Sequence, residues 1–316
     1  MHIRRLRGWE LPESAATPES LYFTRRSALT AAAGLIAGAA LPAAARANDP
    51  ASGLYPARRN EAYTLDRPLT PEAKASTVNN YYEFSYAKNV APATRLFRPR
   101  PWVVKVDGLV EKPFEIGIDD LLGKMALEER LYRHRCVEAW SMAVPWTGFP
   151  MAAFLDLAKP LSGAKFVRFE TFKDPAMAPN QKDFRLPWPY VEGITMAEAG
   201  NELAFLVTGV YGKPAPTQFG APLRLALPWK YGFKSIKGIT RISFTDRQPV
   251  SFWEGLQDSE YGFWANVNPQ YAHPRWSQAT EEDLATGARR PTLIFNGYGP
   301  FVADLYKGRE NERIWY

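Results

Sequence analysis

Short apolar or alternating runs, each bounded by turn residues, constrain the fold of this 316-residue chain more than any other feature. Runs of this length are typical of β-strands, and they cover residues 102–106, 131–137, 165–172, 203–210, 223–227, 239–244 and 293–295. Helical patterns are fewer and cover residues 71–76, 118–125, 151–159 and 195–200. Residues 48–100 are rich in Pro, Ala and Asn and should form an extended N-terminal segment. The pattern predicts a β-rich fold of the α+β class in one domain, although strand spacing alone does not separate one domain from two.

The first 47 residues have the pattern of an export signal. Arg25 and Arg26 come directly before an apolar run at 28–41, and Ala45-Arg46-Ala47 fits a cleavage site. The run is too short to cross a hydrocarbon core of ~30 Å as a helix, and the paired arginines resemble a twin-arginine signal. We expect cleavage after Ala47, export by the twin-arginine translocase and a periplasmic mature chain of residues 48–316. An ordinary secretory signal is the alternative.

The composition excludes several classes of function. Cys136 is the only cysteine of the chain, which rules out an intramolecular disulfide, a CxxC redox pair and multi-cysteine metal sites. The formal charge of +6 comes from interspersed acids and bases, so it gives no support for nucleic-acid binding. The chain also lacks the glycine-rich nucleotide loops, the HExxH helix and the GxSxG elbow of common enzyme classes.

The lone cysteine lies in a cluster of reactive side chains. On a strand, His134, Cys136 and Glu138 would share one face, and Arg133 and Arg135 would take the other. The arginines are expected to lower the pKa of the thiol and to favour the thiolate, which attacks electrophiles and binds soft metals. A buried structural cysteine is the alternative interpretation.

Two further segments could bind a ligand. Residues 228–238 carry three lysines and a serine around two glycines, with Arg224 just upstream. Such a basic turn suits a phosphate, although a solvated basic hairpin explains it as well. Residues 79–84 place amide, phenol and carboxylate groups in a loop. These groups can read the polar edges of a ring system, but ordinary turn chemistry is the alternative.

Taken together, these motifs resemble one known family. The segments that carry the resemblance are residues 79–84, 132–141, 144–146, 148–150, 228–234, 265–269, 273–281 and 295–298. They are similar to the catalytic subunit of the bacterial periplasmic, molybdopterin-dependent protein-methionine-sulfoxide reductases, within the sulfite oxidase superfamily. The resemblance spans roughly residues 70–306, and Cys-Val-Glu-Ala-Trp and Pro-Trp-Lys-Tyr-Gly-Phe-Lys are its most specific motifs.

The resemblance implies a cofactor and its contacts. Cys136 would be the single protein ligand to molybdenum, with one molybdopterin, in the form without a nucleotide, per chain. The implied cofactor contacts are Asn79, Tyr82, Glu83, Cys136, Thr171, Arg224, Ser235, Ile236 and Lys237. The chain departs from the family at Phe219, where an asparagine is usual. Glu138 is a further candidate catalytic residue, as a proton carrier or as a group that shapes the pocket.

The implied activity is oxygen-atom transfer from methionine sulfoxide in oxidised periplasmic proteins. The electrons would come from a membrane haem-containing subunit that draws on quinol, and residues 273–281 are a candidate surface for it. Three rival functions remain open: a sulfite oxidase-like enzyme or other small S- or N-oxide oxidoreductase with the same cofactor, a metal-free thiol reductase, and a binding protein without turnover. Sulfite is a dianion and would require cations at the metal.

Overall fold

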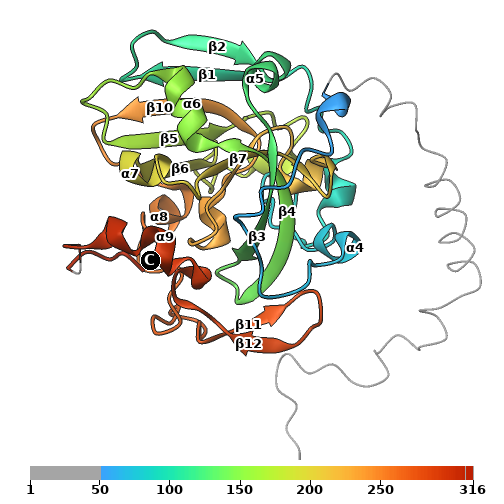
Figure 1. Ribbon diagram of the computed structural model, residues 1–316, viewed down its shortest axis with the longest axis vertical. Coiled ribbons are helices and arrows are strands. Elements are labelled where there is room, and N and C mark those ends of the chain that lie inside the picture. Colours follow the sequence, from blue (N-terminus) through green and yellow to red (C-terminus); the bar gives the residue numbers. More distant parts are fainter. Residues whose placement is uncertain (1–50, 310, 316) are drawn as a thin grey trace, which may run out of the picture. The chain divides into compact units, whose positions relative to one another are not determined.

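The computed structural model describes residues 51–309 and 311–315, which fold around two β-sheets (Figure 1). The expected signal peptide, residues 1–47, lies outside the described residues. In the five-stranded sheet, the order is β2 (Phe114–Gly117), β1 (Val103–Gly108), β10 (Ile239–Thr245), β5 (Phe166–Thr171) and β6 (Val191–Thr195). Strands β1 and β10 are parallel, and the other neighbours are antiparallel.

The seven-stranded sheet is built on one long strand. Its members are β3 (Glu128–Arg135), β4 (Trp140–Pro150), β7 (Phe205–Val210), β8 (Lys213–Pro214), β9 (Arg224–Ala226), β11 (Thr280–Asp283) and β12 (Arg289–Pro291). β4 pairs with β3 along most of its length, with β11 at its start and with β7 at its end. Because β11 joins β4 at Trp140 and Ser141, the C-terminal part of the chain lies directly beside the turn that contains Cys136.

The helices are short. They are α4 (Glu72–Ala75), α5 (Ile118–Lys124), α6 (Met151–Ala158), α7 (Met196–Ala199), α8 (Phe252–Leu256) and α9 (Gly299–Val302). α7 and α8 begin with a capping box, in which Thr195 and Ser251 accept from the backbone three residues on. Within the described part of the chain, none of the helices is both long and apolar enough to cross a membrane.

The expected β-rich α+β class is confirmed, as are the four expected helices and most of the expected strands. The strand expected at 293–295 is wrong. Leu293 and Ile294 are exposed, and Phe295 and Asn296 adopt left-handed backbone conformations within a 3-10 turn, η7 (Ile294–Gly297). The strand expected at 131–137 ends at Arg135 instead. β4 is missed because ten of its eleven residues are buried, which removes the alternation that marks a half-exposed strand.

Candidate active site

Cys136 lies in the tight turn that joins β3 to β4. Its backbone N–H donates to the carbonyl of Trp140 (2.9 Å), and the N–H of Ala139 donates to the carbonyl of Cys136 (3.1 Å). Ala139 has a φ of 62°, in the left-handed region. The expected continuous strand through Cys136 is therefore replaced by a turn, which places the sulfur at the end of the hairpin rather than on a sheet face.

Three polar groups surround the sulfur of Cys136. The side-chain amide of Asn80 lies 3.4 Å from Sγ, the backbone N–H of Glu138 lies 3.5 Å away, and Glu138 Oε2 lies 3.8 Å away. Burial raises the pKa of the Cys136 thiol to about 12, and the negative charge of Glu138 acts in the same direction. Arg135 does lower this pKa, as expected, but burial outweighs the effects of Arg135 and Lys88, so the expected thiolate is not favoured.

The carboxylate of Glu138 is held by three donors. Its Oε2 atom accepts from the Trp140 indole (3.1 Å), from the Asn80 amide (3.2 Å) and from the ammonium of Lys88, which forms an ion pair with it. Burial alone would raise the pKa of Glu138, but these bonds hold it below its ordinary value. Glu138 therefore places a negative charge beside Cys136.

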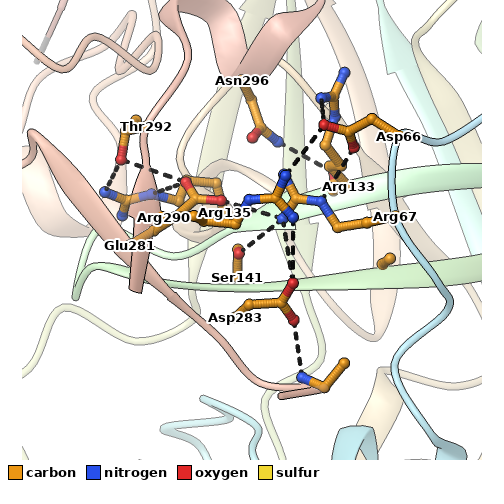
Figure 2. Close-up of polar contacts among 12 residues, drawn as sticks. Asp66, Arg67, Arg133, Arg135, Ser141, Glu281, Asp283, Arg290, Thr292 and Asn296 are labelled. Atoms are coloured by element: carbon orange, nitrogen blue, oxygen red, sulfur yellow. Dashed lines mark hydrogen bonds and ion pairs between the residues drawn. The ribbon is translucent and has the colours of Figure 1, made fainter. Parts of the chain in front are cut away.

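Arg133 and Arg135 point away from the sulfur, as the sequence predicted, into a network of charges (Figure 2). Arg135 is fully buried, and its Nε lies 2.8 Å from Glu281 Oε2. Figure 2 shows Arg67 reaching the same carboxylate, with Nη1 3.3 Å from Glu281 Oε1. The two arginines therefore stabilise the face of β3 that lies opposite the sulfur, and neither places an unpaired charge beside Cys136.

Residues 276–281 also hold the backbone of the Cys136 turn. The indole of Trp276 and the amide of Gln278 both donate to the carbonyl of Val137, each at 2.7 Å, and Arg135 donates to the carbonyl of Cys136. Gln278 and Glu281 are buried. The segment 273–281 thus supports the turn through its buried side chains, while Pro274, Arg275, Ser277 and Ala279 are exposed, as expected for a surface element.

A pocket opens above the turn and is referred to below as the Cys136 pocket. Of the residues that sequence reasoning singled out, its lining includes Asn79, Tyr82, Glu83, Cys136, Glu138, Arg224, Ser235, Ile236 and Lys237. Thr171 does not line it. Instead, the Thr171 hydroxyl makes hydrogen bonds of 2.8 and 2.9 Å to the carbonyls of Lys237 and Gly238, and so supports the loop behind the pocket.

Sequence reasoning missed several residues of the pocket. Asn80 and His134 belong to motifs that were recognised, but they were given no role. Tyr190, Trp253 and Tyr261 lie in segments without any motif and reach the pocket only through the tertiary fold. No local pattern could have found these aromatic residues.

Positive charge is concentrated at one end of the Cys136 pocket. Arg224 is buried and donates only to backbone carbonyls, those of Phe219 (2.9 Å), Ser235 (3.2 Å) and Leu225 (3.3 Å). Burial lowers the pKa of Arg224 to about 10, and burial together with Arg224 lowers the pKa of Lys237. Across residues 51–309 and 311–315, neither cation forms an ion pair with a carboxylate. The carboxylate of Glu83 acts against the lowering of the pKa of half-buried Lys237, whereas no carboxylate acts on buried Arg224. The excess of positive charge favours the binding of an anion, such as a phosphate.

Close backbone approaches shape the same end of the pocket. A Cβ atom at Gly232 would lie 2.5 Å from His134 Nε2, and one at Gly238 would lie 2.6 Å from the Tyr81 hydroxyl. Burial and the two cations lower the pKa of His134, so its ring is neutral at ordinary pH. The buried hydroxyl of Tyr81 has no hydrogen-bond partner in the described part of the chain. The pocket thus offers a ligand both cations and an unused polar atom, which fits a pterin with a phosphate.

A comparison with protein families agrees with this fit. A family model described as an oxidoreductase molybdopterin binding domain matches residues 90–253, which include Cys136, Arg224 and Lys237. Among solved structures, the sulfane dehydrogenase SoxCD from Paracoccus pantotrophus is similar, with 15% identity and a TM-score of 0.42. The match covers 58% of this chain and 54% of that chain, so this chain spans about half the length of that relative.

Proposed function

Because the chain belongs to the family of oxidoreductases with a molybdopterin-binding domain, we propose that it is a molybdenum-dependent methionine sulfoxide reductase. Its substrates would be oxidised proteins, in which it converts methionine sulfoxide to methionine. The reaction consumes two electrons and two protons, and it yields a thioether and one water. The motif resemblance around Cys136 and residues 228–238 supports this choice within the family.

The residues of the Cys136 pocket would hold one cofactor per chain, in the form without a nucleotide. Cys136 would contribute its sulfur as the protein ligand of molybdenum, since a thiolate suits such a soft centre. Arg224 and Lys237 would balance the charge of the pterin phosphate, and the backbone of Ser235 and Ile236 lines the same end of the pocket. The free hydroxyl of Tyr81 would meet a polar edge of the ligand.

When bound, the cofactor supplies an acceptor for the oxygen atom and a store for two electrons. The chain contributes position and electrostatics. Asn80 and the backbone of Glu138 fix the sulfur of Cys136, and Trp276 and Gln278 fix the turn that carries it. Two roles were expected for Glu138, a proton carrier and a group that shapes the pocket. Because three donors hold its carboxylate in place, we favour the second role.

The observation that carries the choice of substrate is the carboxylate of Glu138, 3.8 Å from Cys136 Sγ. The ion pair of Glu138 with Lys88 offers a sulfite dianion no net positive charge beside Cys136, and Arg133 and Arg135 point away from this side. A sulfoxide is neutral and needs no such charge. A thiol reductase is disfavoured because the chain has no second cysteine to resolve an oxidised thiol.

We further propose a periplasmic location, with export through the twin-arginine translocase, and electron supply from a membrane haem-containing, quinol-linked subunit. The paired arginines at residues 25 and 26 and the family resemblance support these proposals. Protease protection of the protein in spheroplasts, with and without a functional translocase, tests the location. A change of Arg25 and Arg26 to lysine should retain the protein in the cytoplasm.

Steady-state assays test the activity. The protein is purified from a host that makes molybdenum cofactor and is assayed with an oxidised protein, free methionine sulfoxide and sulfite. We expect about one molybdenum per chain and reduction of both sulfoxides. A Cys136→Ser variant should lose activity and most of the metal. Efficient sulfite oxidation without sulfoxide reduction, or full activity without molybdenum, contradicts the proposal.

A further inference from the structure

A second pocket adjoins the Cys136 pocket and is called the outer pocket below. Four residues line both pockets: Tyr82, Glu138, Trp253 and Tyr261. The three aromatic rings contact one another, with centroid distances of 5.1 Å from Tyr82 to Trp253 and 5.1 Å from Trp253 to Tyr261. They form an aromatic collar, a wall that the Cys136 pocket shares with the outer pocket.

The wall of the outer pocket beyond the collar is apolar. It is formed mainly by Tyr86, Leu186, Phe252, Leu256 and Trp276. Tyr86 and Leu256 are exposed, at 57% and 40%. Exposed apolar side chains around a hollow are typical of a binding surface rather than of ordinary protein surface.

The two ionised groups in this wall already have partners. Arg275 forms an ion pair with Glu260 (2.6 Å), and Glu138 forms one with Lys88. The outer pocket therefore presents no unpaired charge to an incoming group. A charged side chain placed there would lose hydration without gaining a partner, whereas an apolar side chain would be buried favourably.

We propose that the outer pocket is a specificity subsite for an apolar side chain of the protein substrate, located two residues from the methionine sulfoxide. This inference rests on the proposed function, since it needs a polypeptide substrate whose sulfoxide enters the Cys136 pocket. In an extended segment, side chains two residues apart lie on the same face, about 6.6 to 6.8 Å apart along the chain. Side chains of adjacent residues point to opposite faces, so the direct neighbour of the methionine sulfoxide cannot enter the outer pocket while the sulfoxide occupies the Cys136 pocket.

Short capped peptides with one methionine sulfoxide test the subsite on the holoenzyme. The set carries phenylalanine two positions before or after the sulfoxide, phenylalanine at an adjacent position, or serine throughout. We expect one of the two-position peptides to have a KM about tenfold below that of the serine peptide, with a similar kcat. The adjacent-position peptide should resemble the serine peptide. Titration calorimetry with methionine sulfone, which is not reduced, should give the same order of affinities.

Leu256→Glu places a charge in the outer pocket, and the fold should accept it because Leu256 is 40% exposed. We expect this variant to lose the preference for phenylalanine. The matched control is Leu161→Glu, an equally exposed leucine outside both pockets, which should keep it. Equal KM values for the phenylalanine and serine peptides, or an unchanged preference in Leu256→Glu, overturn the subsite. Failure of the wild-type enzyme to reduce any sulfoxide overturns the proposed function instead.

Discussion

The side-chain amide of Asn80 lies 3.4 Å from the sulfur of Cys136 and donates a hydrogen bond to it. The same amide nitrogen lies 3.2 Å from Glu138 Oε2, and the Asn80 carbonyl oxygen accepts from Lys88 (2.6 Å). A neutral residue of the N-terminal segment thus joins the sulfur to its flanking ion pair. Asn80 lies outside the residues that the family model matches, so it reaches the site from a separate part of the chain.

Replacement of Asn80 by leucine should slow the enzyme without removing its metal. The variant keeps the approximate shape but loses the donor to Cys136 and Glu138, and a hydrogen bond to a charged group contributes about 1.5 to 3 kcal/mol. We expect a decrease in kcat of about tenfold or more at an unchanged molybdenum content. The control is Asn60→Leu, which removes an equivalent amide bond of 2.8 Å to Glu128. Equal rates in the two variants would contradict a positioning role for Asn80.

Local sequence patterns predicted β1, β5 and β10 of the five-stranded sheet. Buried residues alternate with exposed or half-buried residues in β1 and β5, whereas β10 was found as a short, mostly apolar run without regular alternation. They failed at β4, where burial on both faces hides the alternation and Pro145 and Gly148 suggest a break. Gly148 instead allows a close approach, since a Cβ atom there would lie 2.0 Å from the carbonyl oxygen of Leu206. The register of β4 against β7 shifts at this point.

The site was predicted where it consists of contiguous motifs. The turn at Cys136 and the basic loop up to Lys237 were recognised as separate clusters, and the fold brings them to one pocket. Lys88, Trp253 and Tyr261 could not be predicted, because each enters through a contact between segments that are distant in sequence. The net direction of the shift in the pKa of Cys136 was also mispredicted, because the sequence of charged residues along a strand does not show how deeply the thiol is buried.

Lys237→Met should separate cofactor binding from folding. Burial and Arg224 lower the pKa of Lys237, so the charged amine is costly in the folded chain, and methionine fills a similar volume. We expect the free energy of unfolding of cofactor-free protein to stay equal or to increase. Retention of molybdenum should weaken about tenfold, which corresponds to the loss of one charge-assisted contact. Lys105→Met, at an exposed ion pair with Asp107 (3.6 Å), is the control and should change neither quantity. A normal metal content in Lys237→Met would contradict the role of Lys237.

Acidification should destabilise the fold in part through His273. Burial lowers the pKa of His273, Arg275 acts in the same direction and Glu260 opposes them. As the pH falls, the histidine is therefore protonated in the unfolded chain at a higher pH than in the folded chain. Its effect on stability is absent above the ordinary histidine pKa of about 6.5, and the free energy of unfolding decreases as the pH falls below that value. His273→Phe keeps the stack on Trp276, whose centroid distance is 3.8 Å. Urea unfolding at pH 7.5 and 5.5 should show a smaller loss in the variant, by up to about 1.4 kcal/mol. Because both proteins retain His134, identical losses would rule out a contribution from His273.

The charge network behind β3 should be the most sensitive structural element near the site. Glu281→Gln removes the carboxylate that pairs with Arg135, and the two side chains are 1% and 0% exposed. A buried cation left without its partner typically costs about 3 to 5 kcal/mol, and Arg135 also donates to the carbonyl of Cys136. We therefore expect a loss of this size in urea unfolding, together with a lower molybdenum content. Glu111→Gln is the matched control, because its ion pair with Lys159 (3.8 Å) is exposed and should contribute less than about 1 kcal/mol. If both variants lost the same small free energy of unfolding, Glu281 would not be the residue that holds the Cys136 turn in place through Arg135.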